Sequence, residues 1–299
     1  MAEALSPADA LEEALETTTR YRSLWGDAAR RFSRNRTAML GLAVILVLAA
    51  MAVAAPLIER NDPSFQEYSA LQQSPSGKYW LGTDLLGRDQ WSRLVHGARI
   101  SLSVGFLTQA VALAIGMAVG LAAGLGGRSI DNLMMRLTDV AYAFPDILML
   151  ILLLSVFGPN FIMIFVAIGL VSWPTLARLI RGQILSLQER DYVLAARAMG
   201  ATRIRILFTH LMPNTLGPVT VAVVFGIPFA IFAEAALAFI GLGLQPPTPS
   251  WGRLVTDGFS AIRSSPHLVL FSSLAIAITM MAFTFIGDGL RDALDPRGR

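Results

Sequence analysis

The sequence contains no cysteine, and this absence removes several kinds of site at once. Disulfide bonds, thiolate zinc sites, iron–sulfur clusters and cysteine nucleophiles all require the missing side chain. Histidine is also scarce, because His96, His210 and His267 are its only occurrences and they lie far apart in the chain. Their spacing does not match that of metal ligands, so we expect no metal site.

Signatures of ATP binding and of enzyme catalysis are missing as well. A phosphate-binding loop ends in a lysine followed by serine or threonine, whereas the only lysine of the chain, Lys78, is followed by Tyr79. The serines and carboxylates have no spacing that indicates a catalytic group, and no basic stripe indicates nucleic-acid binding. We therefore expect a chain without catalytic residues and without a bound cofactor of its own.

Charged residues are few and apolar residues are abundant. They make up 15% and 54% of the 299 residues, compared with about 25% and about 45–50% in soluble domains. A membrane-spanning helix needs about 20 mainly apolar residues, and several segments meet this requirement. The sequence thus predicts an all-α membrane protein with about six transmembrane helices, near 38–58, 101–125, 133–157, 161–179, 216–242 and 268–287.

The distribution of basic residues predicts the orientation of the chain in the membrane. If the N-terminus is cytoplasmic, 17 of the 24 lysine and arginine residues fall in cytoplasmic segments, as the positive-inside rule requires. Both termini and the segment 188–214 then face the cytoplasm. Arg88, Arg93 and Arg99 lie together on the opposite side and weigh against this count.

Residues 1–37 precede the first span and are expected to form a cytoplasmic tail that ends in an amphipathic helix. Trp25, Ala29 and Phe32 recur at helical spacing, while arginines occupy the other faces. A helix with one apolar and one basic face suits the membrane surface. We expect this helix to lead along the interface into a single transmembrane domain, residues 38–299.

The most informative segment lies between the fourth and fifth spans, at 188–214. Asp191 can cap a helix, and Gly200 suits the left-handed position that ends one. Thr202 can cap a second short helix, which we expect over 203–211. The first helix is predicted to have an apolar stripe, formed by Tyr192, Ala195, Ala196 and Met199.

This pattern predicts a docking element for a soluble partner. Two angled helices on the membrane surface offer an apolar stripe with arginines beside it, and small alanines allow another backbone to approach. A DNA-binding helix-turn-helix has a similar outline, but a duplex cannot approach an element that is held flat between two spans. A solvated surface loop without a partner is the remaining alternative.

The same segment resembles a motif of known transporters. Ala195, Ala196 and Gly200, followed by thirteen residues that end in Pro213, resemble the EAA loop of permeases from binding-protein-dependent ABC importers. Three positions depart from the general motif and resemble its dipeptide, oligopeptide and nickel branch instead: Leu194, His210 and Met212.

Eight further segments resemble the same branch and occur in its order, so that the resemblance covers about residues 25–299. They are LGTD at 81–84, GRD at 87–89, GARISL at 97–102, MRLTD at 135–139, EAA at 234–236, FIGLG at 239–243, QPPTPSWG at 245–252 and GDGLRDALDP at 287–296. The set is most similar to the second, C-type permease subunit.

The resemblance implies an ABC importer permease of the type I fold in the bacterial inner membrane. A heterodimer of two permease subunits would form the pathway, two cytoplasmic ATPase subunits would use ATP and magnesium, and an extracytoplasmic binding protein would deliver the substrate. We expect a di- or oligopeptide, although the branch also moves nickel chelates, glutathione and oligosaccharides. The residues implied in ATPase coupling are Tyr192, Ala195, Ala196, Arg197, Met199, Gly200, Ala201, Arg203 and Pro213.

Four polar residues near or inside the spans are candidates for the translocation pathway. Burying a carboxylate at mid-membrane costs ~2.5–3.5 kcal/mol on insertion scales, so Glu234 is expected either to line the pathway or to bond to a neighbouring helix. Asp139 follows Arg136 by three residues and is expected to pair with it. Thr108 and Gln109 can line a polar path or join helices.

Other possibilities stay open at this point. A secondary transporter or channel would work without ATPase subunits, but it usually shows internal repeats, and we find none. A membrane scaffold would not need the structured segment 188–214. The segment 245–267 is rich in turn-forming residues, and with Trp251 it is expected to form either a compact external face or an interfacial anchor.

Overall fold

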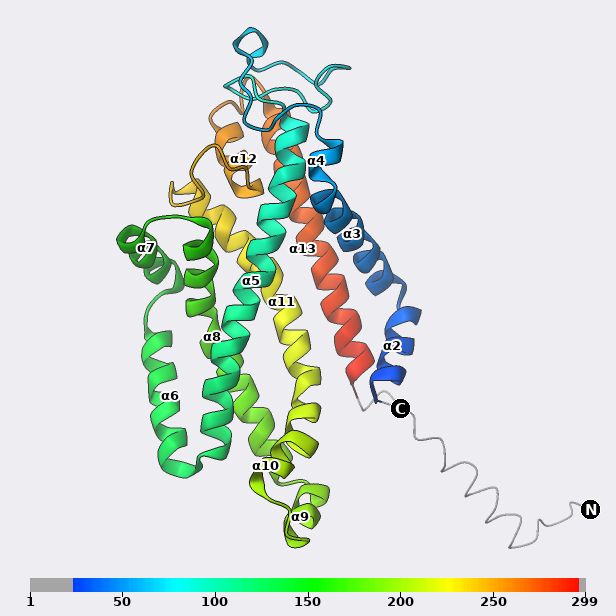
Figure 1. Ribbon diagram of the computed structural model, residues 1–299, viewed down its shortest axis with the longest axis vertical. Helices are drawn as coiled ribbons and strands as arrows, with labels where there is room; N and C mark the ends of the chain where they lie inside the picture. Colours follow the sequence, from blue (N-terminus) through cyan, green and yellow to red (C-terminus); the bar gives the residue numbers. More distant parts are fainter. Residues whose placement is uncertain (1–23, 296–299) are drawn as a thin grey trace, which may run out of the picture.

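The computed structural model describes residues 24–295, and the regular structure in this part of the chain is helical, without a named β-strand. Long helices run along the molecule, and short helices lie at its two ends (Figure 1). We call the end with α9 and α10 the α9 end and the opposite end the α12 end. Residues 1–23 of the predicted tail, 1–37, lie outside the described residues.

The elements follow one another along the chain, and most of the connections between them are short. They are α2 (Leu24–Arg34), α3 (Arg36–Val53), α4 (Ala55–Ile58), η1 (Tyr68–Ala70), α5 (Gln90–Leu125), α6 (Gly127–Ala143), α7 (Asp146–Phe157), α8 (Phe161–Gln188), α9 (Asp191–Ala198), α10 (Arg203–Ile206), η2 (Leu207–Leu211), α11 (Met212–Phe239), α12 (Trp251–Phe259) and α13 (Pro266–Leu294). The main irregular stretch, 59–89, lies at the α12 end (Figure 1).

Five stretches of helix in the described residues are long and apolar enough to cross a membrane, and the bent pair α6–α7 makes a sixth span if it is counted as one. The predicted class, an all-α membrane protein with about six spans, is therefore confirmed. Helix α5 is longer than the expected span, because it begins at Gln90 and not at 101. The Asp89 carboxylate caps it by accepting a hydrogen bond from the Ser92 backbone N–H at 3.1 Å. Helix α8 likewise continues to Gln188 instead of ending near 179.

The third predicted span is not one straight helix. The expected range 133–157 is divided between α6 and α7, which are bent by 84° at a break over Phe144 and Pro145. Phe144 has extended backbone angles, the conformation that a following proline favours. Since proline also lacks an N–H group, the hydrogen-bond ladder is interrupted at this break.

Helices α5 and α8 pack closely through small residues. Gly116, Gly120 and Gly124 recur every four residues and so lie on one face of α5. A Cβ atom at Gly120 would lie 2.8 Å from the Ala177 backbone oxygen, and one at Gly124 would lie 2.6 Å from Cγ2 of Ile184. The glycines therefore let the two backbones approach each other, which is a common way of joining helices in membranes.

Helix α12 covers the bundle at the α12 end. Trp251 is fully buried; its indole N–H donates to the Leu94 backbone oxygen at 3.0 Å, and its backbone N–H donates to the Ser101 hydroxyl at 3.1 Å. These bonds hold α12 against α5. The role of interfacial anchor is thus wrong for Trp251, because an anchor lies at the surface that faces lipid headgroups.

Helix α2 packs against the end of α13 at the α9 end. Ala28 is buried, whereas Ala29, which the sequence places on the apolar stripe, is exposed. Phe32 contacts the bundle, since a Cβ atom at Gly289 of α13 would lie 3.3 Å from its ring. The inward face of α2 therefore includes Phe32, as predicted, but has Ala28 where the sequence predicts Ala29.

Candidate functional site

The segment between α8 and α11 forms an elbow that projects at the α9 end (Figure 1). We define the elbow as residues 191–206, which comprise α9, α10 and the turn between them. Helix α9 is capped at Met199, and Gly200 follows with a φ angle of +80°. The Ala201 backbone N–H then donates to the Ala196 oxygen at 3.0 Å, which closes the turn as in a Schellman motif.

Of the two helix caps predicted for the elbow, one is present in the structure and the other is not. The Thr202 hydroxyl accepts a hydrogen bond from the Arg205 backbone N–H at 3.3 Å and so caps α10, as expected. The cap predicted at Asp191 is wrong, because Arg190 occupies the capping position and Asp191 is the first residue of α9. A carboxylate in the first turn still interacts favourably with the positive end of the helix dipole.

The elbow continues into the fifth span without a break. The sequence predicts a separate helix over 203–211, whereas α10 runs through the π-helical turn η2 directly into α11. Pro213 lies in the first turn of α11, a position that proline tolerates. A displacement of α10 is therefore transmitted to α11 by continuous helix.

The inward face of the elbow belongs to the apolar core. Val193 is fully buried and shares one apolar cluster with Ile184 of α8 and Leu211 next to α11. Ala196 also turns inward, so the predicted stripe is divided between the two faces of α9. Its other members are exposed: Tyr192, Ala195 and Met199.

The outward face of the elbow combines apolar and basic side chains. Met199 is 82% exposed and Ile204 is 71% exposed. Three arginines on the same short segment are exposed as well: Arg197, Arg203 and Arg205. Apolar side chains bordered by arginines are typical of a protein–protein contact surface, so the elbow has the chemistry of a docking site.

A cavity of about 350 Å³ lies among α5, α6, α7, α8 and α11. Its lining includes polar and aromatic side chains: Gln109, Tyr142, Asp146, Ser172, Thr175, Phe225 and Phe229. Gln109 is 4% exposed, and its amide Nε2 has no hydrogen-bond partner in the described part of the chain. Buried polar groups without a partner are rare in native structures, so this amide is an unusual feature of the cavity lining.

Of the four predicted pathway residues, only Gln109 lines this cavity in the described structure. Thr108 is buried and donates to the Phe165 backbone oxygen at 3.4 Å, which joins α5 to α8. Glu234 is fully buried and accepts a hydrogen bond from the Ser250 hydroxyl at 2.7 Å. Thr108 and Glu234 therefore have the helix-joining role that the sequence allowed beside a pathway role.

The ion pair predicted between Asp139 and Arg136 is wrong. Asp139 instead accepts a hydrogen bond from Arg178 of α8 at 2.8 Å. The Arg178 guanidinium also lies 4.5 Å from the centre of the Tyr142 ring. A pair between two helices replaces the pair within α6, because α8 packs alongside α6.

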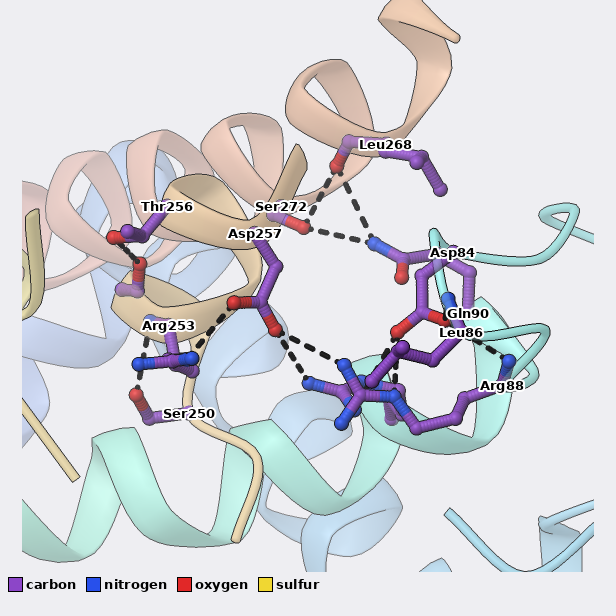
Figure 2. A network of polar contacts seen from close by, with 12 residues as sticks. Asp84, Leu86, Arg88, Gln90, Ser250, Arg253, Thr256, Asp257, Leu268 and Ser272 are labelled. Carbon is purple, nitrogen blue, oxygen red and sulfur yellow. Dashed lines mark hydrogen bonds and ion pairs between the residues drawn. The ribbon is translucent and has the colours of Figure 1, made fainter. Parts of the chain in front are cut away.

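Buried ion pairs connect the irregular stretch 59–89 to the bundle (Figure 2). Arg88 donates to Asp84 at 2.7 Å and to Asp257 of α12 at 3.2 Å. Arg93 of α5 donates to the same Asp257 oxygen at 3.0 Å. Two of the arginines that depart from the predicted charge distribution are thus paired with carboxylates, so they add little net positive charge to this end.

A bundle of about six spans, with an exposed elbow at one end and a polar cavity between its helices, is the architecture expected of a membrane permease. The chain belongs to the family of binding-protein-dependent transport system inner membrane components, whose profile matches residues 116–299. Residues 23–75 match the N-terminal transmembrane domain of oligopeptide transport permease C. The chain is accordingly a multi-pass inner membrane protein of the importer permease type.

Individual relatives support this assignment. The chain is 44% identical over 281 residues to the oligopeptide transport system permease protein OppC of Escherichia coli strain K12, with 93% of each chain covered. It is 40% identical over 277 residues to the glutathione transport system permease protein GsiD of Pectobacterium atrosepticum, with 92% of each chain covered. An inward-facing structure of the MetNI methionine ABC transporter matches with a TM-score of 0.56 and 19% identity, over 68% of this chain and 96% of that chain, which confirms the fold.

Proposed function

We propose that this chain forms part of the translocation pathway of an ATP-driven importer and that its elbow docks onto a cytoplasmic ATPase subunit. The proposal rests on one observation: the exposed tip of the elbow is joined to α8 by the buried cluster around Val193 and to α11 by continuous helix. Both helices line the cavity. Movement of the tip is thereby passed to the pathway, and the chain itself needs no catalytic residue.

The proposed assembly contains a second permease subunit, two ATPase subunits and an extracytoplasmic binding protein. The family description, which names dependence on a binding protein, supports this composition. The ATPase subunits bind ATP and magnesium, and this chain binds no cofactor. We place both termini and the α9 end in the cytoplasm, because most arginines of the chain then lie inside.

We propose short peptides as the substrate class. One relative is named for oligopeptide transport and the other for glutathione transport, and glutathione is itself a tripeptide. Nickel chelates and oligosaccharides are the alternatives that the same machinery allows. A secondary transporter or channel is the alternative from a different class, and it differs by moving substrate without ATP.

Uptake by membrane vesicles that contain the chain with its partner subunits and binding protein tests this proposal. Gly200→Val should abolish ATP-dependent uptake of a labelled tripeptide, because valine is strained at a φ of +80° and the elbow would deform. Gly158→Val is the matched control, since Gly158 has a φ of +78° but lies between α7 and α8. No described atom lies within 4 Å of a Cβ atom at either position, so strain alone is compared.

Three results would contradict the proposal. Normal uptake by the inserted Gly200→Val protein would show that the elbow does not couple ATP to transport. Equal losses in Gly158→Val would show that the effect is not specific to the elbow. Peptide uptake by the purified chain without ATPase subunits would favour the secondary transporter.

A further inference from the structure

We propose that the cavity beside the break between α6 and α7 is a substrate subsite: Asp146 binds the ammonium group of a peptide, and Gln109 donates a hydrogen bond to a peptide carbonyl oxygen. This inference rests on the proposed function and adds to it the groups of the substrate that are recognised. It is argued from the charge, the hydrogen-bonding capacity and the walls of the cavity.

The negative charge of the cavity comes from Asp146. Among the described lining residues it is the only charged side chain. It also makes no ion pair within residues 24–295. The carboxylates of the preceding helix, α6, are already paired with cations, since Asp139 pairs with Arg178 and Asp131 pairs with Arg181. A cationic ligand is therefore favoured over an anionic one.

The position of Asp146 suits a ligand-binding carboxylate. It is the first residue of α7, directly after the break at Phe144 and Pro145. No other described side chain donates a hydrogen bond to its oxygens, so they are free to accept bonds from an ammonium group, and such charge-assisted bonds are among the strongest in proteins.

Gln109 offers the complementary donor. Its Nε2 is buried and has no partner among the described residues. A Cβ atom at Gly226 of α11 would lie 2.6 Å from this nitrogen, so the amide is held against α11 at a place where only glycine fits. A peptide carbonyl oxygen would satisfy the amide, whereas an apolar ligand would leave it unpaired, which is unfavourable for a buried donor.

The remaining walls suit the body of a short peptide. Phe225 and Phe229 provide apolar surface, and the Tyr142 hydroxyl lies 3.4 Å from that of Thr175. An apolar wall with a few placed polar groups is typical of ligand pockets, and about 350 Å³ lies in their range of about 300–1,000 Å³. The cavity thus selects for a free amino terminus and a peptide bond rather than for a particular side chain.

Single introduced cysteines can report on this cavity, because the natural chain has none. Ser172→Cys and Thr175→Cys both place a thiol in its lining. The assembled importer, without binding protein, is treated with a water-soluble maleimide, and the labelling rate of this chain is read from a gel. The competing probes are trialanine, which has a free ammonium group, and N-acetyl-trialanine, which has none.

Trialanine should slow the labelling of both cysteines, and about tenfold more N-acetyl-trialanine should be needed for the same protection, since one charge-assisted bond is lost. Asp146→Asn should remove the difference between the two peptides. Asp139→Asn is the matched control and should retain it, because Asp139 does not line the cavity. Gln109→Leu should weaken protection by both peptides.

Equal protection by the two peptides would overturn the subsite, as would a preference for trialanine that survives Asp146→Asn. Absence of labelling at both cysteines, or labelling that neither peptide slows, would overturn it too. If Asp146→Asn inserts poorly, the comparison of the two peptides on proteins that retain Asp146 still decides the question. Failure of the proposed function would appear elsewhere, as lack of ATP-dependent peptide uptake by the unmodified importer.

Discussion

Val193 and Met199 lie on the same short segment of the elbow but have opposite environments. Val193 is fully buried among residues of α8 and of the start of α11, whereas Met199 is 82% exposed at the turn. A buried side chain contributes mainly to stability, because its removal leaves a cavity. An exposed apolar side chain contributes little to stability and is available to a partner, so substitutions can separate the two roles.

Met199→Glu should therefore reduce the amount of ATPase subunit that copurifies with the chain, because a charge is introduced into the apolar part of the contact. The free energy of unfolding of the Met199→Glu chain, measured by thermal unfolding, should stay within about 0.5 kcal/mol of that of the original chain, as is usual for surface substitutions. Val193→Ala should behave in the opposite way, with a loss of about 1–3 kcal/mol in stability. Loss of stability in Met199→Glu would show that the side chain supports the fold of the elbow.

The contacts of Glu67 predict an acid-sensitive transition at the α12 end. Hydrogen bonds from the Tyr79 hydroxyl and the Lys78 ammonium lower the pKa of Glu67 from its usual 4.5. Because the folded pKa is depressed, these contacts add stability that is fully present above about pH 4.5 and is lost as the pH falls through the lower folded value.

Tyr79→Phe should raise the pH at which the stretch 59–89 loosens, because loss of the hydrogen bond from the Tyr79 hydroxyl brings the pKa of Glu67 back toward 4.5. The rate of cleavage by pepsin, an acid-active protease, measured as a function of pH, gives this midpoint. Tyr68→Phe serves as a control, since Tyr68 bonds Gln66 and not Glu67. An unchanged midpoint in Tyr79→Phe would mean that Glu67 does not control the transition.

At the scale of elements, the close contact between α5 and α8 predicts that a single added methyl group lowers the stability of the protein. A Cβ atom at Gly120 would lie 2.8 Å from both the Ala177 backbone oxygen and Cβ of Ile180, and a backbone cannot move aside locally. Gly120→Ala should therefore cost about 1–3 kcal/mol of stability, measured by thermal unfolding in detergent. Gly182→Ala is the matched control on α8, where no described atom lies within 4 Å of the added methyl.

Gly182→Ala should leave stability unchanged or raise it by up to about 1 kcal/mol, because alanine is the better helix former. The two substitutions make the same chemical change, so their difference isolates the helix contact. Similar melting temperatures for both proteins would show that α5 and α8 can separate without cost, against the close approach described above.

Elements that are determined by residues close together in the sequence could be predicted. The apolar stretch of α3 is long enough to span a membrane wherever it packs, and Gly200 and Thr202 end and begin helices through their own backbone and side chain. The break at Phe144 and Pro145 could not be predicted in this way. A proline inside a span often produces only a small bend, and the 84° angle depends on how α7 packs.

Features that depend on contacts between residues far apart in the sequence could not be predicted. Arg88 and Asp257 are separated by 169 residues, so their pairing depends on the folded bundle. The sequence suggested Gln109 because an amide in a span is conspicuous, but it could not show that its Nε2 lacks a partner. Asp146 was not singled out, since a carboxylate at the start of a helix is common and only the fold reveals which acids are paired.

At the scale of the whole molecule, the two ends of the bundle are built differently. The α12 end is held by buried ion pairs and by Trp251, whereas the α9 end presents an exposed elbow (Figures 1 and 2). The cavity beside the α6–α7 break lies among helices that the elbow contacts. A displacement of the elbow would therefore reach the cavity through α8 and α11, as the proposed coupling requires.

The ion-pair network should be the main determinant of stability at the α12 end. Asp257→Asn removes one of the two carboxylates that the buried Arg88 and Arg93 share, the other being Asp84. The loss of stability should therefore be smaller than the about 3–5 kcal/mol of a buried charge that loses its only partner. Both the melting temperature of the purified chain and the resistance of the stretch 59–89 to protease should fall, since Arg88 belongs to that stretch. Lys78→Ala is the control, because it breaks an exposed pair with Glu67 and should not change the melting temperature measurably. If Asp257→Asn melts like the original chain, the α12 end is held by packing around Trp251 and not by charge.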